Sequence, residues 1–405
     1  MKFFLIPVIF ALAIIVIADG WIYGRLRSRI RFDRVRKIAY WLPSAFFALL
    51  LLFFCFFLPV LSGYKAMVAV MWLLWLYVLI YIPKLFFVLF DALGKGVCRL
   101  FRLRTRVFSY IGLTVAASGA LLFLSGAFVG RTAVHVENVT VTSPRVPEQL
   151  DGFRIVQFSD AHIGNWGSCT GTLEKTVALI DSCHADMVVF TGDFVNNISD
   201  EITPRIIETF RRLQAPCGVY AILGNHDYGD YHSWETPAQW RENLARTKAG
   251  IRACGFDLLL NESRLVAAGD TALQLVGVEN VGKPPFRRYG DLPLALSGLD
   301  TTCFTVLLSH DPTHWRREVL GYPFIDLTLS GHTHAGQSGV ARGRFRWSPS
   351  SWLFDEWEGL YRDGTQYLYV NRGLGYVGLP VRIGMSPEIT CITLRRGDIP
   401  QGAGN

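Results

Sequence analysis

The sequence predicts a group of transmembrane helices followed by an α/β domain whose parallel or mixed sheet is covered by helices. Three observations support this fold class. The first 130 residues hold four apolar runs, strand-like and helix-like stretches alternate from residue 153 onward, and short polar segments follow the strand-like runs. In an α/β fold such segments lie at the carboxyl ends of strands, where these folds place their binding sites.

The apolar runs predict an integral membrane protein. Each has about 20 residues, the length that an α-helix needs to cross a bilayer. They account for the mean hydropathy of +0.28 in a chain of 405 residues. We interpret residues 1–130 as a four-helix transmembrane region in an inner or plasma membrane. The runs are residues 3–23, 40–61, 67–90 and 107–129.

Charges in the loops predict the orientation. Residues 25–37 carry seven Lys and Arg with one acid, and residues 95–106 carry five with none. The positive-inside rule places both loops in the cytoplasm, so everything after residue 130 is expected to be periplasmic or extracellular. An alternative for the first run is a cleaved signal peptide ending near Ala18-Asp19-Gly20. Cleavage would make the basic loop cross the membrane, which its charge disfavours.

The pI near 9.0 does not indicate a nucleic-acid partner. From residue 130 onward we count 25 basic and 30 acidic residues, a formal charge of −5. The basic excess therefore belongs to the membrane loops, and binding to a phosphate backbone is not expected. Six of the eight cysteines lie in this later part. An exported domain would permit disulfides between them, and buried free thiols are the alternative.

The chain after the helices is expected to form a connector and one domain. Residues 131–152 alternate in polarity and predict a connector with a short lead-in strand, and residues 153–396 predict the domain. Helix-like stretches separate the strand-like runs, as in a parallel or mixed sheet. The strand-like runs that precede polar segments are residues 153–158, 187–190, 217–223, 304–308 and 324–329.

The five polar segments are rich in Asp, His and Asn. Oxygen and nitrogen ligands of these types bind pairs of adjacent divalent metals. Because each segment follows a strand, we expect their side chains to meet at one edge of the sheet. Together they indicate a dinuclear metal hydrolase. The segments are Ser159–His162, Gly192–Phe194, Gly224–Asp227, Ser309–His310 and Gly331–His334.

Taken in order, these segments resemble the calcineurin-like metallophosphoesterase superfamily. The tail Asn371-Arg372-Gly373, followed by Pro380 and by Pro387-Glu388-Ile389, resembles its membrane-associated YkuE/YaeI-type branch. The resemblance covers roughly residues 131–395. It implies a mixed β-sheet sandwich flanked by helices, and a metal-dependent phosphoric ester hydrolase with two divalent metal ions (Mn, Fe or Zn).

The resemblance also implies the ligands of each metal. Asp193 would bridge the two ions, because a carboxylate has two oxygens to share. The first metal would be held by Asp160, His162, Asp193 and His334, and the second by Asp193, Asn225, His310 and His332.

Three further residues receive roles. The resemblance implies that His226 stands over the phosphate and protonates the leaving oxygen, with Asp227 orienting its imidazole. Arg372 is a candidate to bind a substrate phosphate bidentately, and a salt-bridged side chain is the alternative. His314 lies one helical turn after His310, but the family pattern does not use it, and we expect it at the surface.

The sequence thus predicts a membrane-anchored phosphoesterase that uses metal-activated water. Its expected substrate is a phosphodiester or pyrophosphate, either a phosphorylated small molecule or a lipid-linked envelope component. The alternative is a non-catalytic sensor that binds a phosphate ligand on the same scaffold; the intact ligand set with His226 favours the enzyme. Asp19, Lys84 and Asp91 are expected near helix ends, where their charges snorkel. Few other polar residues interrupt the spans, so we expect an anchor rather than a transporter.

Overall fold

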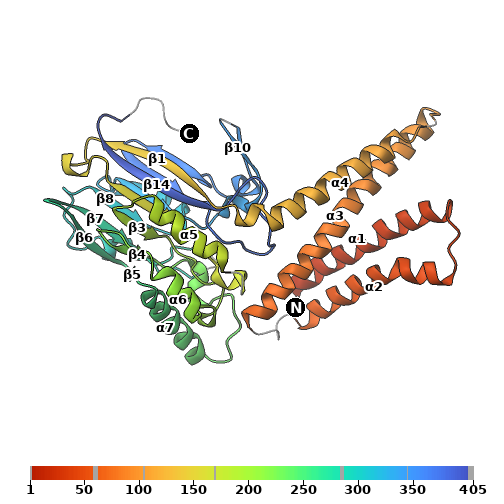
Figure 1. The fold of residues 1–405 in the computed structure, drawn as a ribbon, viewed down its shortest axis with the longest axis horizontal. Coiled ribbons are helices and arrows are strands. Elements are labelled where there is room, and N and C mark those ends of the chain that lie inside the picture. The colour runs from red at the N-terminus through yellow and green to blue at the C-terminus, as the bar shows by residue number, and fades with distance from the viewer. Residues whose placement is uncertain are drawn as a thin grey trace. The chain divides into compact units, whose positions relative to one another are not determined.

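A computed structural model of the chain forms two compact units, Met1–Ala127 and Phe128–Asn405, which are described separately (Figure 1). Cys169 and the end of the apolar run 40–61 lie outside the described residues. The structure describes residues 2–57, 63–103, 105–167, 170–282, 287–343 and 345–399.

The first unit consists of four long helices, drawn from red to orange in Figure 1. All four are long and apolar enough to cross a membrane, which confirms the predicted transmembrane region. Helix α1 packs against α2 and α3. Large apolar side chains such as Phe10, Leu49 and Leu121 remain exposed on the helices, as expected for faces that lipid covers. The helices are α1 (Lys2–Arg27), α2 (Arg34–Phe57), α3 (Tyr64–Leu100) and α4 (Val107–Phe128).

The charges within the helices are paired inside the unit, which corrects the expectation that they snorkel. The Asp19 carboxylate accepts hydrogen bonds from Ser44 Oγ at 2.7 Å and Tyr81 Oη at 3.1 Å. Lys84 Nζ lies 2.7 Å from its other oxygen. Because the carboxylate of Asp19 is only 3% exposed, these neighbours replace the water that it loses.

The second unit contains two six-stranded mixed sheets. In the first sheet β2 to β5 are parallel, and β14 joins β2 in antiparallel orientation. Its order is β1 (His135–Ser143), β14 (Glu388–Arg396), β2 (Arg154–Phe158), β3 (Met187–Phe190), β4 (Val219–Ala221) and β5 (Asp257–Leu258).

In the second sheet β7, β8, β9 and β13 are parallel, and the outer strands β6 and β12 are antiparallel. A separate hairpin pairs β10 (Val340–Arg342) with β11 (Phe345–Trp347). The order of the second sheet is β12 (Gly359–Asp363), β13 (Gln366–Val370), β9 (Leu327–Ser330), β8 (Thr305–Leu308), β7 (Thr271–Gly277) and β6 (Glu262–Ala268).

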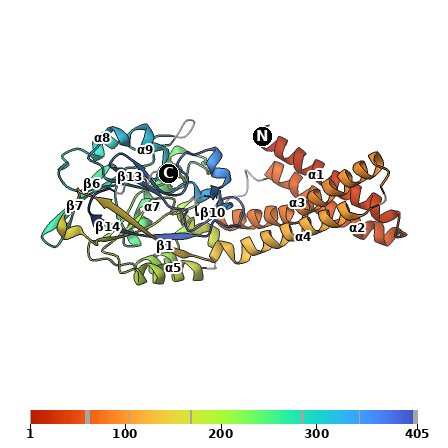
Figure 2. The ribbon, with the colours of Figure 1, turned by 90° about the horizontal axis from the view of Figure 1, so that it is seen from above.

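Helices cover the outer faces of both sheets, and Figure 2 shows the resulting layers. One apolar cluster fills the space between the sheets, a second lies under α5 to α7, and a third lies under α8 and α9. Strands buried on both faces read as continuous apolar runs, as β3 does. This sandwich confirms the predicted fold class. The helices are α5 (Gly171–Ser182), α6 (Pro204–Phe210), α7 (Pro237–Ala253), α8 (Leu292–Ala295) and α9 (Thr313–Arg317).

The residues expected to form a connector contribute a strand of the first sheet. Strand β1 pairs in parallel with β14 over nine positions, from His135↔Glu388 to Ser143↔Arg396. The first and last strands of the second unit are therefore neighbours. The described cysteines, including Cys183 and Cys391 in this region, are free thiols.

Candidate metal centre

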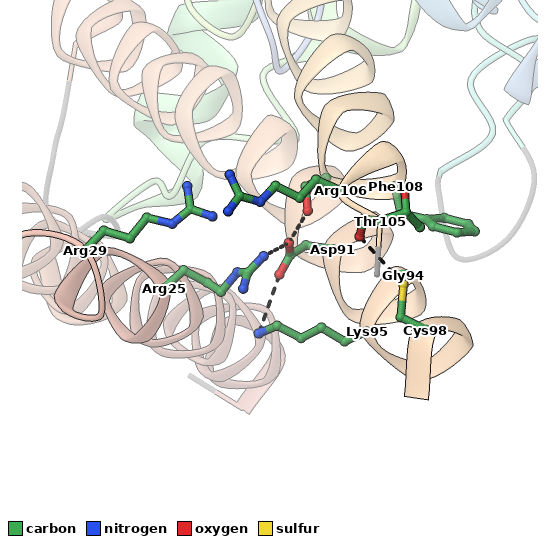
Figure 3. Close-up of a pocket in the computed structure, with 10 residues that line it drawn as sticks. Arg25, Arg29, Asp91, Gly94, Lys95, Cys98, Thr105, Arg106 and Phe108 are labelled. Carbon is green, nitrogen blue, oxygen red and sulfur yellow. Dashed lines mark hydrogen bonds and ion pairs between the residues drawn. The ribbon is translucent and has the colours of Figure 1, made fainter. Parts of the chain in front are cut away.

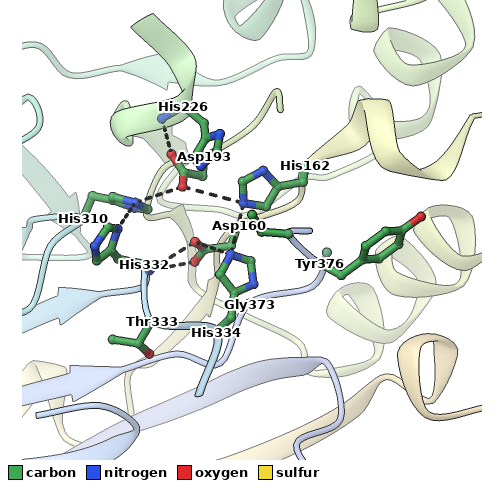
Figure 4. A network of polar contacts seen from close by, with 12 residues as sticks. Asp160, His162, Asp193, His226, His310, His332, Thr333, His334, Gly373 and Tyr376 are labelled. Atoms are coloured by element: carbon green, nitrogen blue, oxygen red, sulfur yellow. Dashed lines mark hydrogen bonds and ion pairs between the residues drawn. The ribbon is translucent and has the colours of Figure 1, made fainter. Parts of the chain in front are cut away.

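The five polar segments follow five strands, and the loops that carry them converge (Figure 4). Asp160 and Asp193 come two and three residues after β2 and β3, and Asn225 comes four residues after β4. His310 and His332 each come two residues after a strand of the second sheet, β8 and β9. Because these strands are parallel within each sheet, their carboxyl ends lie at the same edge.

The residues assigned to the first metal form a close cluster. His334 Nε2 lies 3.3 Å from Asp160 Oδ1 and 3.1 Å from His162 Nε2. His162 Nε2 in turn lies 3.6 Å from Asp193 Oδ2. All four side chains are less than a tenth exposed. The structure therefore brings all four predicted ligands of this ion together.

The residues assigned to the second metal form an adjoining cluster. Asn225 Oδ1 lies 2.8 Å from His332 Nδ1 and 3.1 Å from His310 Nε2. His310 Nε2 also lies 3.2 Å from Asp193 Oδ2, the same oxygen that faces His162 in the first cluster. One carboxylate oxygen is thus shared between both sets of donors.

The spacing of these donor atoms fits divalent metal ions. Neighbouring donors in the two clusters lie between 2.8 and 3.6 Å apart. Two donors at right angles on one ion, with bonds of 2.0–2.2 Å, lie about 3 Å apart. Each cluster combines carboxylate or amide oxygens with imidazole nitrogens, the donor set that suits Zn, Mn or Fe. The residues present therefore fit two ions.

The backbone at the clusters is strained. Asp160, His162, Asp193, His332 and His334 all have positive φ angles, between 42° and 72°. Such left-handed conformations cost of order 1 kcal/mol or more for residues other than glycine, and they gather at functional sites. Five of the seven predicted ligands share this feature. The fold thus maintains an unfavourable backbone so that these side chains point at one another.

A close approach of two loops also requires glycine. Gly192 has φ +98°, and a Cβ atom there would lie 2.6 Å from the backbone nitrogen of Gly224. A Cβ on Gly224 would lie 2.2 Å from Asp193 Oδ1. Both glycines directly precede predicted ligands. A larger side chain at either position would collide with the groups at the metal centre.

Asp227 has a different role from the one predicted. Its carboxylate accepts hydrogen bonds of 2.8–2.9 Å from the backbone nitrogens of Asp193, Phe194, Val195 and Gly224. It therefore fixes the loop that presents Asp193 instead of orienting an imidazole. The sequence could not distinguish these roles, because three of the four donors are backbone atoms of a distant segment.

The imidazole of His226 is oriented by a carbonyl group. Its Nδ1 lies 2.6 Å from the carbonyl oxygen of Asn196, so Nδ1–H donates to that oxygen. The ring stacks on Tyr231 with centroids 4.4 Å apart. Its Nε2 is the nitrogen left for other partners, and the residue lines a pocket of about 330 Å³ beside Asp193 and Asn225. His226 is thus placed beside both clusters.

Glu201 was not predicted, although it holds two of the site's loops. Its carboxylate accepts hydrogen bonds from the backbone nitrogens of Gly164, Asn196, Asn197 and Ile198. Burial raises the pKa of Glu201 to about 7, and the backbone donors oppose this rise. Since Asn196 orients His226, Glu201 acts on the site through this loop. No motif in the sequence identifies it.

Arg372 does not face the pocket as a phosphate-binding side chain. Its Nε pairs with Glu358, it lies 3.3 Å from Glu388, and its side chain is 15% exposed. Both carboxylates are buried, so they need this cation. The salt-bridged alternative therefore holds. Another arginine, Arg382, was not predicted to be near the site. It is fully buried, and its Nη2 lies 3.2 Å from Nδ1 of His334.

His314 is buried instead of lying at the surface. Its Nδ1 lies 2.8 Å from Ser309 Oγ and its Nε2 lies 3.2 Å from Glu318. Burial lowers its pKa to about 4, although the charge of Glu318 opposes this. The helical spacing from His310 thus reflects packing beneath the site, and His314 is absent from both ligand clusters.

Burial and neighbouring charges shift the pKa values of the residues in the two clusters. Burial raises the pKa of Asp160 to about 6 and lowers that of His162 to about 3. The charge of His310 holds the pKa of Asp193 well below its usual range, against the effect of burial. The charge of Asp193 raises the pKa of His310 to about 10, again against burial. Bound cations would instead favour ionised carboxylates and neutral imidazoles.

Two family models match this chain. "Calcineurin-like phosphoesterase" matches residues 153–336, the range that holds both clusters. "Probable Calcineurin-like phosphoesterase, transmembrane domain" matches residues 1–131, the range of the four helices.

Several curated relatives are similar to about two thirds of this chain. The "Uncharacterized metallophosphoesterase YkuE" of Bacillus subtilis is 35% identical over 63% of this chain and 84% of its own length. The bovine "Transmembrane protein with metallophosphoesterase domain" is 28% identical, over 64% of this chain and 57% of that protein. The "UDP-2,3-diacylglucosamine pyrophosphatase LpxG" of Chlamydia trachomatis is 27% identical over 65% of this chain and 90% of its own length.

Proposed function

This chain belongs to the calcineurin-like phosphoesterase family of metal-dependent phosphoric ester hydrolases, and we propose that it cleaves a lipid-linked phosphodiester or pyrophosphate at a dinuclear metal site. The observation that carries the proposal is the shared carboxylate. Asp193 Oδ2 faces His162 at 3.6 Å and His310 at 3.2 Å, one residue from each cluster. A ligand that serves both ions sets them side by side, as two-metal hydrolysis requires.

The two metal ions, when bound, would supply an activated water and a clamp for the phosphoryl oxygens. The protein supplies the remaining parts. Asn196 holds Nδ1 of His226, which leaves Nε2 to give a proton to the leaving oxygen. Asp227 and Glu201 fix the loops that carry Asp193 and Asn196, so that these groups need little reorganisation when the substrate binds.

An apolar surface beside the pocket supports a lipid-linked substrate. Among the described residues after 130, eight large apolar side chains are exposed, and five of them gather within residues 340–353. Phe354 continues this surface to the metal centre, with its ring 5.6 Å from that of His332. Such a patch suits acyl chains or a lipid surface. We call it the apolar rim; its members are Val340, Phe345, Trp347, Trp352 and Leu353.

Two features of the wider protein agree with this substrate class. The four membrane helices anchor the site to a membrane, where lipid-linked phosphates are found. The relatives from Chlamydia carry names that specify a diacylated nucleotide pyrophosphate. The basic loops support a catalytic unit on the periplasmic or extracellular side. The positive-inside rule places residues 25–37 and 95–106 in the cytoplasm, and the span that follows the second loop then carries the chain to the opposite side.

The proposal is tested with the full-length protein in detergent, stripped of metal and reloaded with Mn²⁺ or Zn²⁺. We expect two ions per chain and hydrolysis of bis-p-nitrophenyl phosphate and of a diacylated nucleotide pyrophosphate. Asp193→Asn should lose more than half of the bound metal, because Asp193 alone is assigned to both ions. His226→Ala should keep its metal.

Elemental analysis and product release distinguish the outcomes. Full metal occupancy in Asp193→Asn would contradict the shared ligand. Saturable phosphate binding by the metal-loaded protein, without turnover of any ester tested, would instead identify a sensor on this scaffold.

A further inference from the structure

The four-helix unit contains a second polar site, unrelated to the metal centre. A pocket of about 240 Å³ opens between the carboxyl ends of α1 and α3 and the amino end of α4 (Figure 3). Four of its lining side chains are cationic and one is acidic. The cations are Arg25, Arg29, Lys95 and Arg106, and the acid is Asp91.

Asp91 organises the pocket from a buried position. Its carboxylate, which is fully buried, accepts hydrogen bonds from Trp21 Nε1 at 2.9 Å and from Ser109 Oγ at 2.6 Å. Arg25 Nη2 lies 2.9 Å and Lys95 Nζ 3.6 Å from its oxygens. Residues from α1, α3 and α4 thus meet at one carboxylate, which fixes two of the cations at the base of the pocket.

Small residues allow this approach of α3 and α4. A Cβ on Gly94 would lie 2.4 Å from Cβ of Phe108, and a Cβ on Gly112 would lie 2.8 Å from Cβ of Phe90. Gly94 is on α3 beside Asp91 and Lys95, and it also lines the pocket. The close packing of the two helices is what brings the cations of separate loops together.

The pocket keeps an excess of positive charge. Four cations and one carboxylate give it a formal charge of +3. Among the residues that the structure describes, no acidic side chain pairs with Arg29 or Arg106. Figure 3 shows their guanidinium groups turned toward each other. A cluster of this kind is costly to assemble without an anion, since like charges repel.

Phosphate chemistry fits this arrangement best. Arginine side chains bind phosphate oxygens bidentately, and the pocket offers two that remain uncommitted. Arg29 follows the end of α1 and Arg106 precedes the start of α4, at the ends of apolar spans where lipid phosphates lie. Basic pockets between membrane helices bind anionic head groups in this position. We propose that the pocket binds a phosphate anion, carried by an anionic lipid head group or free in solution.

The test measures thermal unfolding of the full-length protein in a zwitterionic detergent. The probes are dioctanoyl phosphatidylglycerol, dioctanoyl phosphatidylcholine and inorganic phosphate. The pocket variant is Arg29→Gln with Arg106→Gln. The matched control is Arg27→Gln with Arg99→Gln, which removes the same charge from the carboxyl ends of α1 and α3. Both residues are exposed and neither lines the pocket.

For a lipid ligand we expect phosphatidylglycerol to raise the midpoint in a saturable way in the wild type and the control. Phosphatidylcholine should not raise it, and the pocket variant should lose the rise. If inorganic phosphate alone reproduces this pattern, the ligand is a soluble phosphate. An equal rise in the pocket variant, or an equal loss in the control, would overturn the proposal. Lipid phosphorus retained through purification gives a second measurement, expected to fall only in the pocket variant.

Discussion

The chain buries carboxylates in both of its units, but it balances their charge in different ways. In the four-helix unit Asp19 and Asp91 face lysine and arginine side chains within 2.7–3.6 Å, so each carboxylate has its own permanent cation. In the second unit Asp160 and Asp193 form their ion pairs with histidines only.

The difference shows which buried carboxylates need a bound metal cation. A permanent cation replaces the hydration that a buried carboxylate loses, whereas a histidine does so only while it is protonated. Burial works against that protonation at His162, whose pKa falls to about 3. The buried carboxylates Asp19 and Asp91 of the helices are therefore balanced without a bound cation. The centre of the second unit reaches a comparable balance when divalent cations bind.

The largest expected effect is a loss of catalytic rate at the metal centre without a loss of metal. His226→Ala should lower kcat for alkyl phosphodiesters by 10² to 10⁴, about 3–5 kcal/mol of transition-state stabilisation. The loss should be smaller for p-nitrophenyl esters, because p-nitrophenolate leaves without a proton. Steady-state kinetics on both substrates, with metal content and KM little changed, checks this. Equal losses on the two esters would leave His226 as a phosphate-positioning residue.

A second test compares the two kinds of carboxylate directly, by thermal unfolding of metal-free protein. Asp19→Ala leaves Lys84 without its partner and should cost about 3 kcal/mol, since Lys84 is 30% exposed and retains some water. Asp160→Asn should instead raise the midpoint, because it removes a charge that burial disfavours. Adding metal should raise the midpoint of the wild type and not of Asp160→Asn. A loss of stability in metal-free Asp160→Asn would contradict the comparison.

A third test concerns a buried histidine outside the metal centre. His314 has a folded pKa near 4 against about 6.5 when unfolded, so the unfolded chain binds the extra proton. Its contribution is complete above pH 6.5 and is lost as the pH falls toward 4. By this linkage the wild type should be about 2 kcal/mol less stable at pH 5 than at pH 8 from this residue alone.

His314→Gln should remove that part of the pH dependence, as measured by unfolding of the metal-loaded protein at several pH values. His184→Asn, on another helix end with a left-handed backbone that asparagine tolerates, should keep the slope of the wild type. An unchanged slope in His314→Gln would show that other groups cause the acid sensitivity.

The smallest expected effect tests whether the second unit uses its apolar rim on lipid. Trp352→Ser with Leu353→Ser should reduce kcat/KM for a diacylated pyrophosphate about tenfold, the loss of roughly 1.4 kcal/mol of contact. Activity on bis-p-nitrophenyl phosphate should not change. Leu265→Ser with Leu294→Ser, exposed apolar residues outside the rim, is the control. A parallel loss on both substrates would mean that the rim supports the site instead of the lipid.

The sequence allowed the membrane helices, the sheet class and the convergence of seven side chains to be predicted, because each depends on a local pattern. A run of 20 apolar residues or an Asp two positions after a strand can be read directly. The partners of Asp227 and Arg372 and the burial of His314 could not be predicted in the same way. Glu358 beside Arg372 and most of the backbone donors around Asp227 come from elsewhere in the fold, and the burial of His314 depends on the packing around its helix.

The pairing of β1 with β14 has a mechanical consequence. The chain leaves α4 at Phe128 and enters β1 at His135, so any drag between a membrane anchor and the second unit passes through this strand. Because β1 lies in register with β14 over nine residues, a pull on its amino end acts along the ladder. The hydrogen bonds then share the load as a set in shear, whereas a strand pulled sideways would release them one after another. The tether is thus attached to a strand that nine paired positions hold in the sheet.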